Sequence, residues 1–400
     1  MKILVLNAGS SSIKFQLFDM DEHDVIAGGL AEKIGETAGA ITYRTIKNGS
    51  ENHTMKEHIV IKDHQAGLSR ISELLLDPEK GALEDANQLQ AVGHRVVHGA
   101  ELFSEPAEVT EQVMKDLKKI SFLAPLHNPA NLKGIEIAKQ VFPNAKQVAV
   151  FDTAFHQTLP PHAYRFSIPK NYYEEHGLRV YGFHGTSHAY VSRTSAEYLG
   201  KELHTFNAIT VHLGNGCSMA AVKEGKSVDV SMGLTPLGGL IMGTRSGDVD
   251  PSLLLFMSDN LGLSSSEIDK TLNKESGLKG LTGDNDLRNI LERYQHQEED
   301  AQLAISMYAY RIKKYVGAYI AALGKVDALI FTAGVGENSA LIRALVCENM
   351  ENLGIKMDKE QNEKVAKETR VLSDTSSNVK ILVVPTNEEL EIAVQTMQFL

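Results

Sequence analysis

Cysteine and long hydrophobic stretches are scarce in this chain. Only Cys217 and Cys347 occur among its 400 residues, which excludes a disulfide framework and a cysteine-rich zinc site. No stretch approaches about 18 uninterrupted apolar residues, so the sequence excludes a membrane-spanning helix. Basic residues number 40 against 51 acidic ones, and the formal net charge of −11 argues against a chain-wide nucleic-acid surface.

What is present is the composition of a soluble globular protein, with 42% hydrophobic and 23% charged residues. At about 100–200 residues per domain, the length predicts two or three domains. The N-terminus, Met-Lys-Ile-Leu-Val-Leu-Asn, returns to polar residues too early for a signal peptide. We therefore expect a cytoplasmic protein with no membrane or nucleic-acid partner.

One pattern of strand, small-residue turn and strand occurs twice. The predicted strands are 2–6, 13–18 and 25–30 in the first copy, and 208–213, 219–222 and 227–231 in the second. Hairpins are common, so coincidence is the competing explanation. The small-residue first turn that both copies share favours a duplicated domain.

Strands alternate with helical patterns in the rest of the chain. The further predicted strands are 147–151, 328–331 and 380–384, and the predicted helices are 301–323, 340–353 and the segment that ends at residue 400. The polar stretch 34–90 predicts only irregular structure with helices. This alternation predicts an α/β fold, in which ligands bind beyond the carboxyl ends of strands.

Small-residue turns are the first candidates for a phosphate site. Gly225-Lys226-Ser227 does not complete a phosphate loop, because the required first glycine is Ala220. Three other turns follow predicted strands, at 7–12, 212–216 and 334–338. Glycine lets backbone N–H groups approach phosphate oxygens, and the last of these turns is expected to open a helix that favours anions.

Basic side chains near such turns are candidate anion ligands. Arg95, Arg245 and Arg288 stand in loops rich in glycine or histidine, where a guanidinium can bind a carboxylate or phosphate with its planar fork. Lys14 follows the first turn, and the residues leave open whether it is a phosphate ligand or a solvated strand residue. His184 and His188 have helical metal-ligand spacing, but Gly185 stands where zinc proteases need glutamate, so an oxyanion donor is the better reading of His184.

Three oxygen-bearing side chains come after predicted strands, which end at Leu6, Phe151 and Val384. Asn7, Asp152 and Glu388 could serve a magnesium-nucleotide site, which takes one or two protein ligands and leaves the other positions to water and phosphate. Caps and turns use the same residue types, which is the competing explanation.

Several motifs in one order resemble the acetate kinase (acetokinase) family, within the superfamily of acetate and sugar kinases, heat-shock 70 proteins and actin. The matching segments are 7–14, 126–130, 150–156, 181–188, 243–248 and 331–338. The resemblance covers essentially the whole chain. It implies two duplicated actin- or ribonuclease H-like domains, 1–152 with 386–400 and 153–385, and a nucleotide cleft between them.

The resemblance also implies reversible transfer of the ATP γ-phosphoryl to acetate, giving acetyl phosphate and ADP, by a homodimer. Asn7 and Glu388 would hold Mg²⁺, with Mn²⁺ as the alternative ion. Asp152 is the family's acid/base residue, and His184 and Arg245 would stabilise the transition state. The implied acetate site consists of Arg95, Val97, Leu126, Phe183 and Pro236. The implied ATP/ADP site consists of Lys14, Ser10, Ser12, His212, Leu213, Gly214, Asn215, Gly216, Asp286, Leu287, Arg288, Gly334, Val335, Gly336, Glu337 and Asn338.

Phosphoryl transfer depends on positioning and charge stabilisation, which predicts direct in-line transfer with Arg95, Arg245 and His184 around the moving group. Acetate is already a carboxylate at pH 7, so we expect Asp152 to orient an arginine or Mg²⁺-bound water. Exclusion of water predicts closure of the two domains about a hinge near Asp152 and Pro385. The alternatives are a propionate or short-chain acyl kinase and a non-catalytic nucleotide-dependent clamp.

Overall fold

The computed structural model describes residues 1–47, 49–125 and 127–400, which form two compact units. The first unit consists of Met1–Ala154 and Asn387–Leu400, and the second of Phe155–Thr386. Among the helices described, none has both the length and the apolar character needed to cross a membrane.

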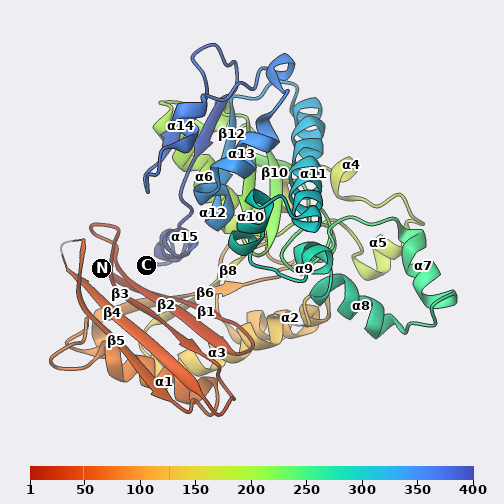
Figure 1. The fold of residues 1–400 in the computed structure, drawn as a ribbon. Coiled ribbons are helices and arrows are strands. Elements are labelled where there is room, and N and C mark those ends of the chain that lie inside the picture. The colour runs from red at the N-terminus through yellow and green to blue at the C-terminus, as the bar shows by residue number, and fades with distance from the viewer. Residues whose placement is uncertain (48, 126) are drawn as a thin grey trace. The chain divides into compact units, whose positions relative to one another are not determined.

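The first unit is built on a sheet of eight strands in the order β5-β4-β3-β2-β1-β6-β8-β7 (Figure 1). The strands are β1 (Lys2–Ala8), β2 (Ser12–Asp19), β3 (Asp24–Glu32), β4 (Gly39–Lys47), β5 (Ser50–Ile59), β6 (Leu89–Val96), β7 (Ala107–Glu108) and β8 (Lys146–Phe151). The helices are α1 (His64–Leu75), α2 (Glu111–Ile120), α3 (Asn128–Val141) and α15 (Glu388–Met397).

Strand β1 is buried on both faces, which explains its unbroken apolar run. Leu4 and Leu6 pack in a core cluster that includes side chains of α1 and α3, whereas Ile3 and Val5 pack with Ile392 of α15. Because successive side chains of a strand point to opposite faces, this single strand joins the two cores of the unit.

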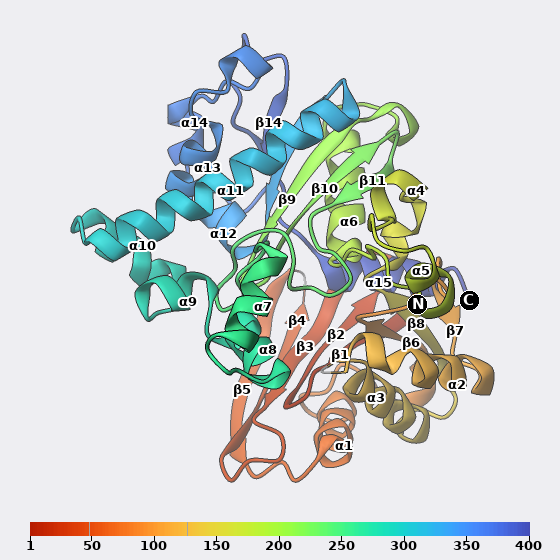
Figure 2. The same cartoon turned by 90° about the vertical axis from the view of Figure 1, so that its right-hand side faces the viewer.

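The second unit is built on a six-stranded sheet in the order β11-β10-β9-β12-β14-β13 (Figure 2). The strands are β9 (Ala208–Leu213), β10 (Cys217–Lys223), β11 (Lys226–Val230), β12 (Ala328–Thr332), β13 (Arg370–Val371) and β14 (Lys380–Val383). The helices are α4 (Pro161–Tyr164), α5 (Asn171–His176), α6 (Gly185–Tyr198), α7 (Pro251–Asp259), α8 (Ser265–Lys274), α9 (Gly277–Thr282), α10 (Leu287–Gln295), α11 (Glu299–Leu323), α12 (Ala333–Asn338), α13 (Ala340–Cys347) and α14 (Lys359–Glu363).

Helices α6 and α11 bury their apolar stripes in the second unit. Val191 and Ala196 of α6 pack on residues of β9, β12 and β14. Helix α11 contacts β9, β10, α9, α10 and α13 (Figure 2). The stripe predicted on residues 301–323 is confirmed, because Ile312 and Val316 are fully buried.

The α/β prediction is confirmed, and the two sheets repeat one strand order. In the first unit β1 pairs antiparallel with β2 and parallel with β6. In the second unit β9 pairs antiparallel with β10 and parallel with β12. Both predicted three-strand patterns therefore occupy equivalent places in their sheets.

Two local predictions are wrong. The stretch 34–90 contains the long strands β4 and β5 as well as α1. Strand β5 lies at the sheet edge and alternates between exposed and half-buried residues, so it has no apolar pattern to detect. Residues 334–338 are not a turn before a helix but part of the short helix α12, and a second helix, α13, follows from Ala340.

Gly93 sets how closely α15 approaches the sheet of the first unit. A Cβ atom at this position would overlap Thr396 Oγ1 and lie 2.9 Å from Ile392 Cγ2, both on α15. We expect Gly93→Ala to lower the free energy of unfolding by about 1–3 kcal/mol, as overpacking does elsewhere. Urea unfolding measures this loss. Thr396→Ala in the same background should recover part of it, and an unchanged stability of Gly93→Ala would contradict this packing.

Candidate active site

One backbone hydrogen bond and one side chain from outside the sheet hold the turn after β1. Gly9 N donates to Ser12 O at 2.8 Å, which closes the turn, and Asn7 lies opposite Lys14 in the hairpin. His64 Nε2 lies 2.7 Å from Gly9 O, and a bond of this length needs the ring nitrogen to donate. The turn is therefore fixed from outside, and Ser10 at its tip remains exposed.

Arg95 and Asp152 form a two-pronged ion pair at the ends of the neighbouring strands β6 and β8. Arg95 Nε donates to Asp152 Oδ1 at 3.0 Å and Nη2 donates to Oδ2 at 2.7 Å. Asp152 is only 1% exposed, and burial raises its pKa while the guanidinium opposes that rise. The carboxylates of Asp152 and Glu388 raise the pKa of Arg95 against the effect of burial. No hydrogen bond of Arg95 Nη1 is found among the described residues.

Asn131 of α3 joins the two loops that carry these groups. Its Nδ2 donates to Ala8 O at 2.8 Å, next to the first turn. Its Oδ1 accepts from Val97 N at 3.1 Å, two residues after Arg95. Since Asn131 is 4% exposed, neither backbone group has water as a ready substitute.

The start of α15 adds two carboxylates to this part of the first unit. Glu388 Oε2 lies 3.8 Å from Arg95 Nη2, and Glu389 forms an ion pair with Lys14. No group of three or more His, Cys, Asp or Glu suited to a metal occurs in the part of the chain that the structure describes. An ion held by the amide of Asn7 and the carboxylate of Glu388 would take its other oxygens from water and phosphate, which fits the preference of Mg²⁺.

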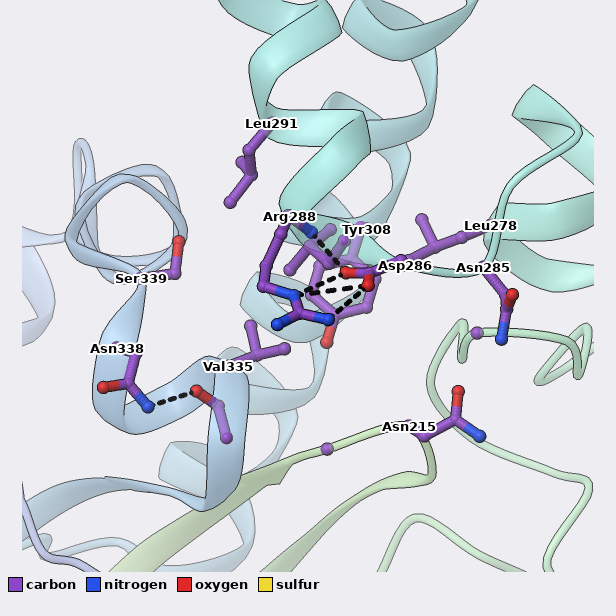
Figure 3. Close-up of a pocket in the computed structure, with 14 residues that line it drawn as sticks. Asn215, Leu278, Asn285, Asp286, Arg288, Leu291, Tyr308, Val335, Asn338 and Ser339 are labelled. Atoms are coloured by element: carbon purple, nitrogen blue, oxygen red, sulfur yellow. Dashed lines mark hydrogen bonds and ion pairs between the residues drawn. The ribbon is translucent and has the colours of Figure 1, made fainter.

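A cavity of about 720 Å³ opens in the second unit (Figure 3). Backbone at Gly214, Gly243 and Gly334 lines it, so main chain rather than side chain meets a ligand there. The apolar side chains are those of Leu278, Leu287, Leu291 and Val335. The volume and the apolar lining suit a small molecule with a flat organic group.

The charged side chains at this cavity neutralise one another. Asp286 caps α10 by accepting from Arg288 N at 2.9 Å, and its two carboxylate oxygens also accept from Arg288 Nε and Nη2 (Figure 3). These hydrogen bonds lower the pKa of Asp286 to about 2. The pair therefore stays ionised at neutral pH with no net charge.

Helix α12 forms another wall of the cavity, and Arg343 stabilises the end of this helix by hydrogen bonds. The buried guanidinium donates to Gly336 O at 3.0 Å and to Glu337 O at 2.9 Å, and it is itself held by Asn362. Burial lowers the pKa of Arg343 to about 10, so the group still carries its charge at neutral pH.

His184 lies beside His212 and close to Arg245. The imidazole rings of His184 and His212 stack with centroids 4.3 Å apart. A Cβ atom at Gly216 would lie 3.5 Å from His184 Nε2 and 3.7 Å from Arg245 Nη1, so both side chains border this glycine. Burial lowers the pKa of Arg245. Arg245 Nη1 donates to Pro236 O at 3.1 Å.

The backbone of His184 is held in an unusual conformation. Its φ of +55° lies in the left-handed region, which is rare for a residue other than glycine. His156 Nε2 lies 3.0 Å from the carbonyl oxygen of Phe183, the preceding residue. Buried contacts of this kind maintain strained backbone at functional sites.

The structure brings many of the expected residues together within each unit. Of the expected nucleotide residues, the cavity is lined by Gly214, Asn215, Asp286, Leu287, Arg288, Gly334, Val335 and Asn338. His212, Leu213, Gly216, Gly336 and Glu337 lie next to these in sequence but do not line it. Leu126 lies outside the described residues.

Sequence reasoning missed several cavity residues. They are Gly243, Leu278, Asn285, Leu291, Tyr308 and Ser339. Gly243 begins the motif that contains Arg245, and Tyr308 precedes Ile312 by one helical turn, so both had a detectable signal. Asn131, His64 and Arg343 were missed because their partners are remote in sequence.

Two sheets that share a core strand order, and a glycine-lined cavity in the second unit, define an α/β protein with a cavity suited to a small molecule. The chain belongs to the acetokinase family, whose model matches residues 2–394. It is 52% identical to the acetate kinase of Helicobacter pylori over 398 residues, covering 100% of this chain and 98% of that one.

Solved structures agree with this assignment. The Porphyromonas gingivalis acetate kinase structure is 46% identical, with a TM-score of 0.94 and 99% of each chain covered. A propionate kinase from Francisella tularensis is 41% identical, with a TM-score of 0.92 and the same coverage.

The bridging role of Asn131 makes a stability prediction. Asn131→Leu leaves Ala8 O and Val97 N without their partner, and each buried unpaired group costs about 1–3 kcal/mol. We expect urea unfolding to show a loss in this range for each group. Asn144→Leu at an exposed asparagine is the matched control and should change stability by less than about 0.5 kcal/mol. Equal effects of the two substitutions would contradict the bridge.

Proposed function

We propose that this protein transfers the γ-phosphoryl group of ATP to acetate, reversibly, giving acetyl phosphate and ADP. One observation carries the proposal beyond family membership. The turn 214–216 lines the cavity with Gly214 and Asn215, and its next residue, Gly216, borders His184 and Arg245. A single turn thus connects a neutral, partly apolar cavity to two nitrogen-bearing side chains that can donate hydrogen bonds, which is the order of base and phosphates in a nucleotide.

In this proposal the cavity holds the nucleoside part of ATP. The apolar side chains Leu278, Leu291 and Val335 support contact with the base, and the glycine backbone allows close approach. The phosphates extend along the turn 212–216 and α12 toward His184 and Arg245. Lys14, Ser10 and Ser12 of the first unit are proposed to contact the phosphates as well.

Acetate is proposed to bind Arg95 through its carboxylate. The support is that Asp152 takes the Nε and Nη2 edge of Arg95, so the guanidinium is fixed in one orientation while Nη1 is left for an anion. Val97, Phe183 and Pro236 are proposed to surround the methyl group. Leu126 keeps its predicted place in this group.

The reaction is direct displacement at phosphorus. An acetate oxygen forms a bond to the γ-phosphorus as the bond to the bridging oxygen of ADP breaks, and the electron pair of that bond stays on ADP. No proton has to move, because acetate is ionised at neutral pH. Arg245 and His184 act by donating hydrogen bonds to the phosphoryl oxygens as charge redistributes over them.

Asn7 and Glu388 are proposed to hold Mg²⁺, or Mn²⁺ as the alternative ion. Their oxygen donors suit a hard cation, and a site with so few protein ligands relies on water and phosphate. When bound, the ion neutralises charge on the nucleotide phosphates. Lys14 is paired with Glu389, and Glu388 lies near Arg95.

Asp152 is proposed to position Arg95 and not to act as a base. The two hydrogen bonds that its carboxylate accepts from Arg95 support this role. Protonation of Asp152 would remove an acceptor from a buried guanidinium, which is costly.

A second candidate substrate is propionate, which the likeness to a propionate kinase favours. One methylene changes discrimination by only about 1–3 kcal/mol. Kinetics with acetate, propionate and butyrate at equal ATP would rank them. Homodimer formation and a cytoplasmic location stay predictions.

The proposed function predicts ATP-dependent formation of acetyl phosphate, trapped by hydroxylamine as the hydroxamate. Arg245→Leu should lower kcat by about 100-fold or more, because a donor to the transition state is lost, while ATP affinity by titration calorimetry stays within a few-fold. No hydroxamate from the intact protein with acetate or propionate would reject the proposal. Variant turnover within a few-fold of the parent would reject the role of Arg245 alone.

Asp152→Asn separates the positioning role from the acid/base role. If Asp152 positions Arg95, Asp152→Asn raises the KM for acetate and lowers kcat. In an Arg95→Lys background Asp152→Asn then has little further effect, because the effects of interacting residues are not additive. Initial rates across pH 5.5–8.5 at saturating Mg²⁺ provide the measurement. If Asp152→Asn instead removes an ionisation from the pH profile and leaves the KM for acetate unchanged, Asp152 is a base.

A further inference from the structure

Three hydrogen-bonded side chains lead from the interior of the second unit to His184. Thr210 Oγ1 on β9 lies 2.7 Å from His188 Nδ1 on α6. His188 Nε2 lies 2.8 Å from Ser218 Oγ on β10, and the same oxygen lies 2.9 Å from His184 Nδ1. Thr210, His188 and Ser218 are each 0% exposed, so their protons must be placed among these partners.

Burial keeps His188 neutral. It lowers the pKa of His188 well below the ordinary value, and the nearby rings of His156 and His212 lower it further. The other groups of the second unit that face the chain are His212, stacked on His184, and Arg245 across Gly216. His156 packs edge-on against His188, and burial lowers the pKa of His156 to about 4. His188 therefore carries one ring proton, on one nitrogen or the other.

Among the described contacts, only two proton arrangements satisfy every bond of the chain and also give both hydroxyl hydrogens an acceptor. In the first, Thr210 donates to His188 Nδ1, His188 Nε2 donates to Ser218, and Ser218 donates to His184 Nδ1. In the second every bond is reversed, and Thr210 must give its proton to the carbonyl oxygen of Ala220.

The distances decide between the two arrangements. The hydroxyl of Thr210 is 2.7 Å from His188 Nδ1 but 3.4 Å from Ala220 O, and a hydroxyl donor prefers about 2.7–2.8 Å. In the first arrangement the hydroxyl of Thr210 donates through its shorter contact, to His188 Nδ1. It leaves neutral His184 with its proton on Nε2, the atom that borders Gly216 together with Arg245 Nη1.

We infer that Thr210, His188 and Ser218 are positioning residues that set the tautomer of His184, so that the neutral ring presents an N–H at Nε2. The inference rests on the proposed function, in which His184 donates to a phosphoryl oxygen. The donor is then ready without ionisation of His184. Turnover therefore does not depend on the imidazolium form, and kcat stays flat as pH rises through the ordinary histidine range near 6.5.

Thr210 is the member of the hydrogen-bonded chain farthest from His184, and changing it provides a test that leaves the site itself untouched. Thr210→Val keeps the volume and removes the hydroxyl, so the two tautomers of His184 are no longer distinguished. Only the imidazolium, with protons on both nitrogens, then guarantees a donor. We expect kcat of Thr210→Val to become pH-dependent and to fall toward alkaline pH as the imidazolium is lost, with the KM for ATP unchanged.

Thr210→Ser is the matched control. It keeps the hydroxyl but removes a buried methyl, so it should lose stability while its kcat and flat pH profile match those of the parent. Ser218→Ala breaks the chain next to His184 and should lower kcat by about 10- to 100-fold, the usual effect of losing a partner that orients a functional histidine. If kcat across these variants correlates with unfolding stability and not with the presence of the hydroxyl group, the hydrogen-bonded chain is structural and the inference fails.

Nitrogen-15 NMR of the unliganded, histidine-labelled protein tests the tautomer without turnover, with His184 assigned from its missing signals in His184→Gln. We expect a protonated Nε2 and a bare Nδ1, and a mixed signal in Ser218→Ala. A bare Nε2 in the parent, or an unchanged signal in Ser218→Ala, would overturn the inference even if the enzyme is active. The inferred tautomer together with full kcat in His184→Gln would instead remove His184 from the proposed function.

Discussion

The register between β9 and β12 is the constraint on which the cavity of the second unit depends. His212 lies opposite Thr332 where these parallel strands end, so the turn at Gly214–Gly216 and the start of α12 leave the same edge of the sheet. Both segments then line one cavity. A slip of one residue would turn the buried side chains of β12 to the other face, so the apolar core that fixes the register also fixes the site.

Each unit contains an arginine that supports the neighbouring backbone, but the charges of the two arginines are compensated by different kinds of acceptor. Arg95 is held by a carboxylate, which fixes the direction of its guanidinium. Arg343 is held by carbonyl oxygens at the end of α12, where the helix dipole favours a positive charge. Removing either partner would leave a charge or a carbonyl uncompensated in the interior, which makes these contacts rigid supports.

Sequence reasoning found what lies at strand ends and missed what is fixed by distant contacts. The turn at Gly214–Gly216 and the segment from Gly334 each follow a predicted apolar strand, so their placement was predictable. Strand β5 was missed because an exposed edge strand needs no apolar face. Asn131 bonds to Ala8, which is 123 residues away, and no periodicity in the sequence encodes such a partner.

The proton chain to His184 was also beyond sequence reasoning, for a related reason. His188 was considered only as a metal ligand, because helical spacing reveals which residues share a face but not what they meet. Its partners Thr210 and Ser218 lie on adjacent antiparallel strands, where Thr210 pairs with Ala220 and His212 with Ser218. The tertiary fold, and not the local pattern, turns this histidine into a neutral link between hydroxyl groups.

The charges around Arg95 and Arg245, two of the expected anion-binding arginines, are unequal, and this difference separates their roles. Arg95 already faces two carboxylates, Asp152 and Glu388, so its charge is compensated and an anion bound there gains chiefly from a fixed geometry. Arg245 has no carboxylate partner among the described residues of its unit, and its guanidinium donates instead to a carbonyl oxygen and a thioether. A partly buried charge without a counter-ion is costly, as its lowered pKa shows, and an incoming phosphate removes that cost. Arg245 is thus the group whose energy changes most when negative charge arrives, while Arg95 is the one whose position matters most.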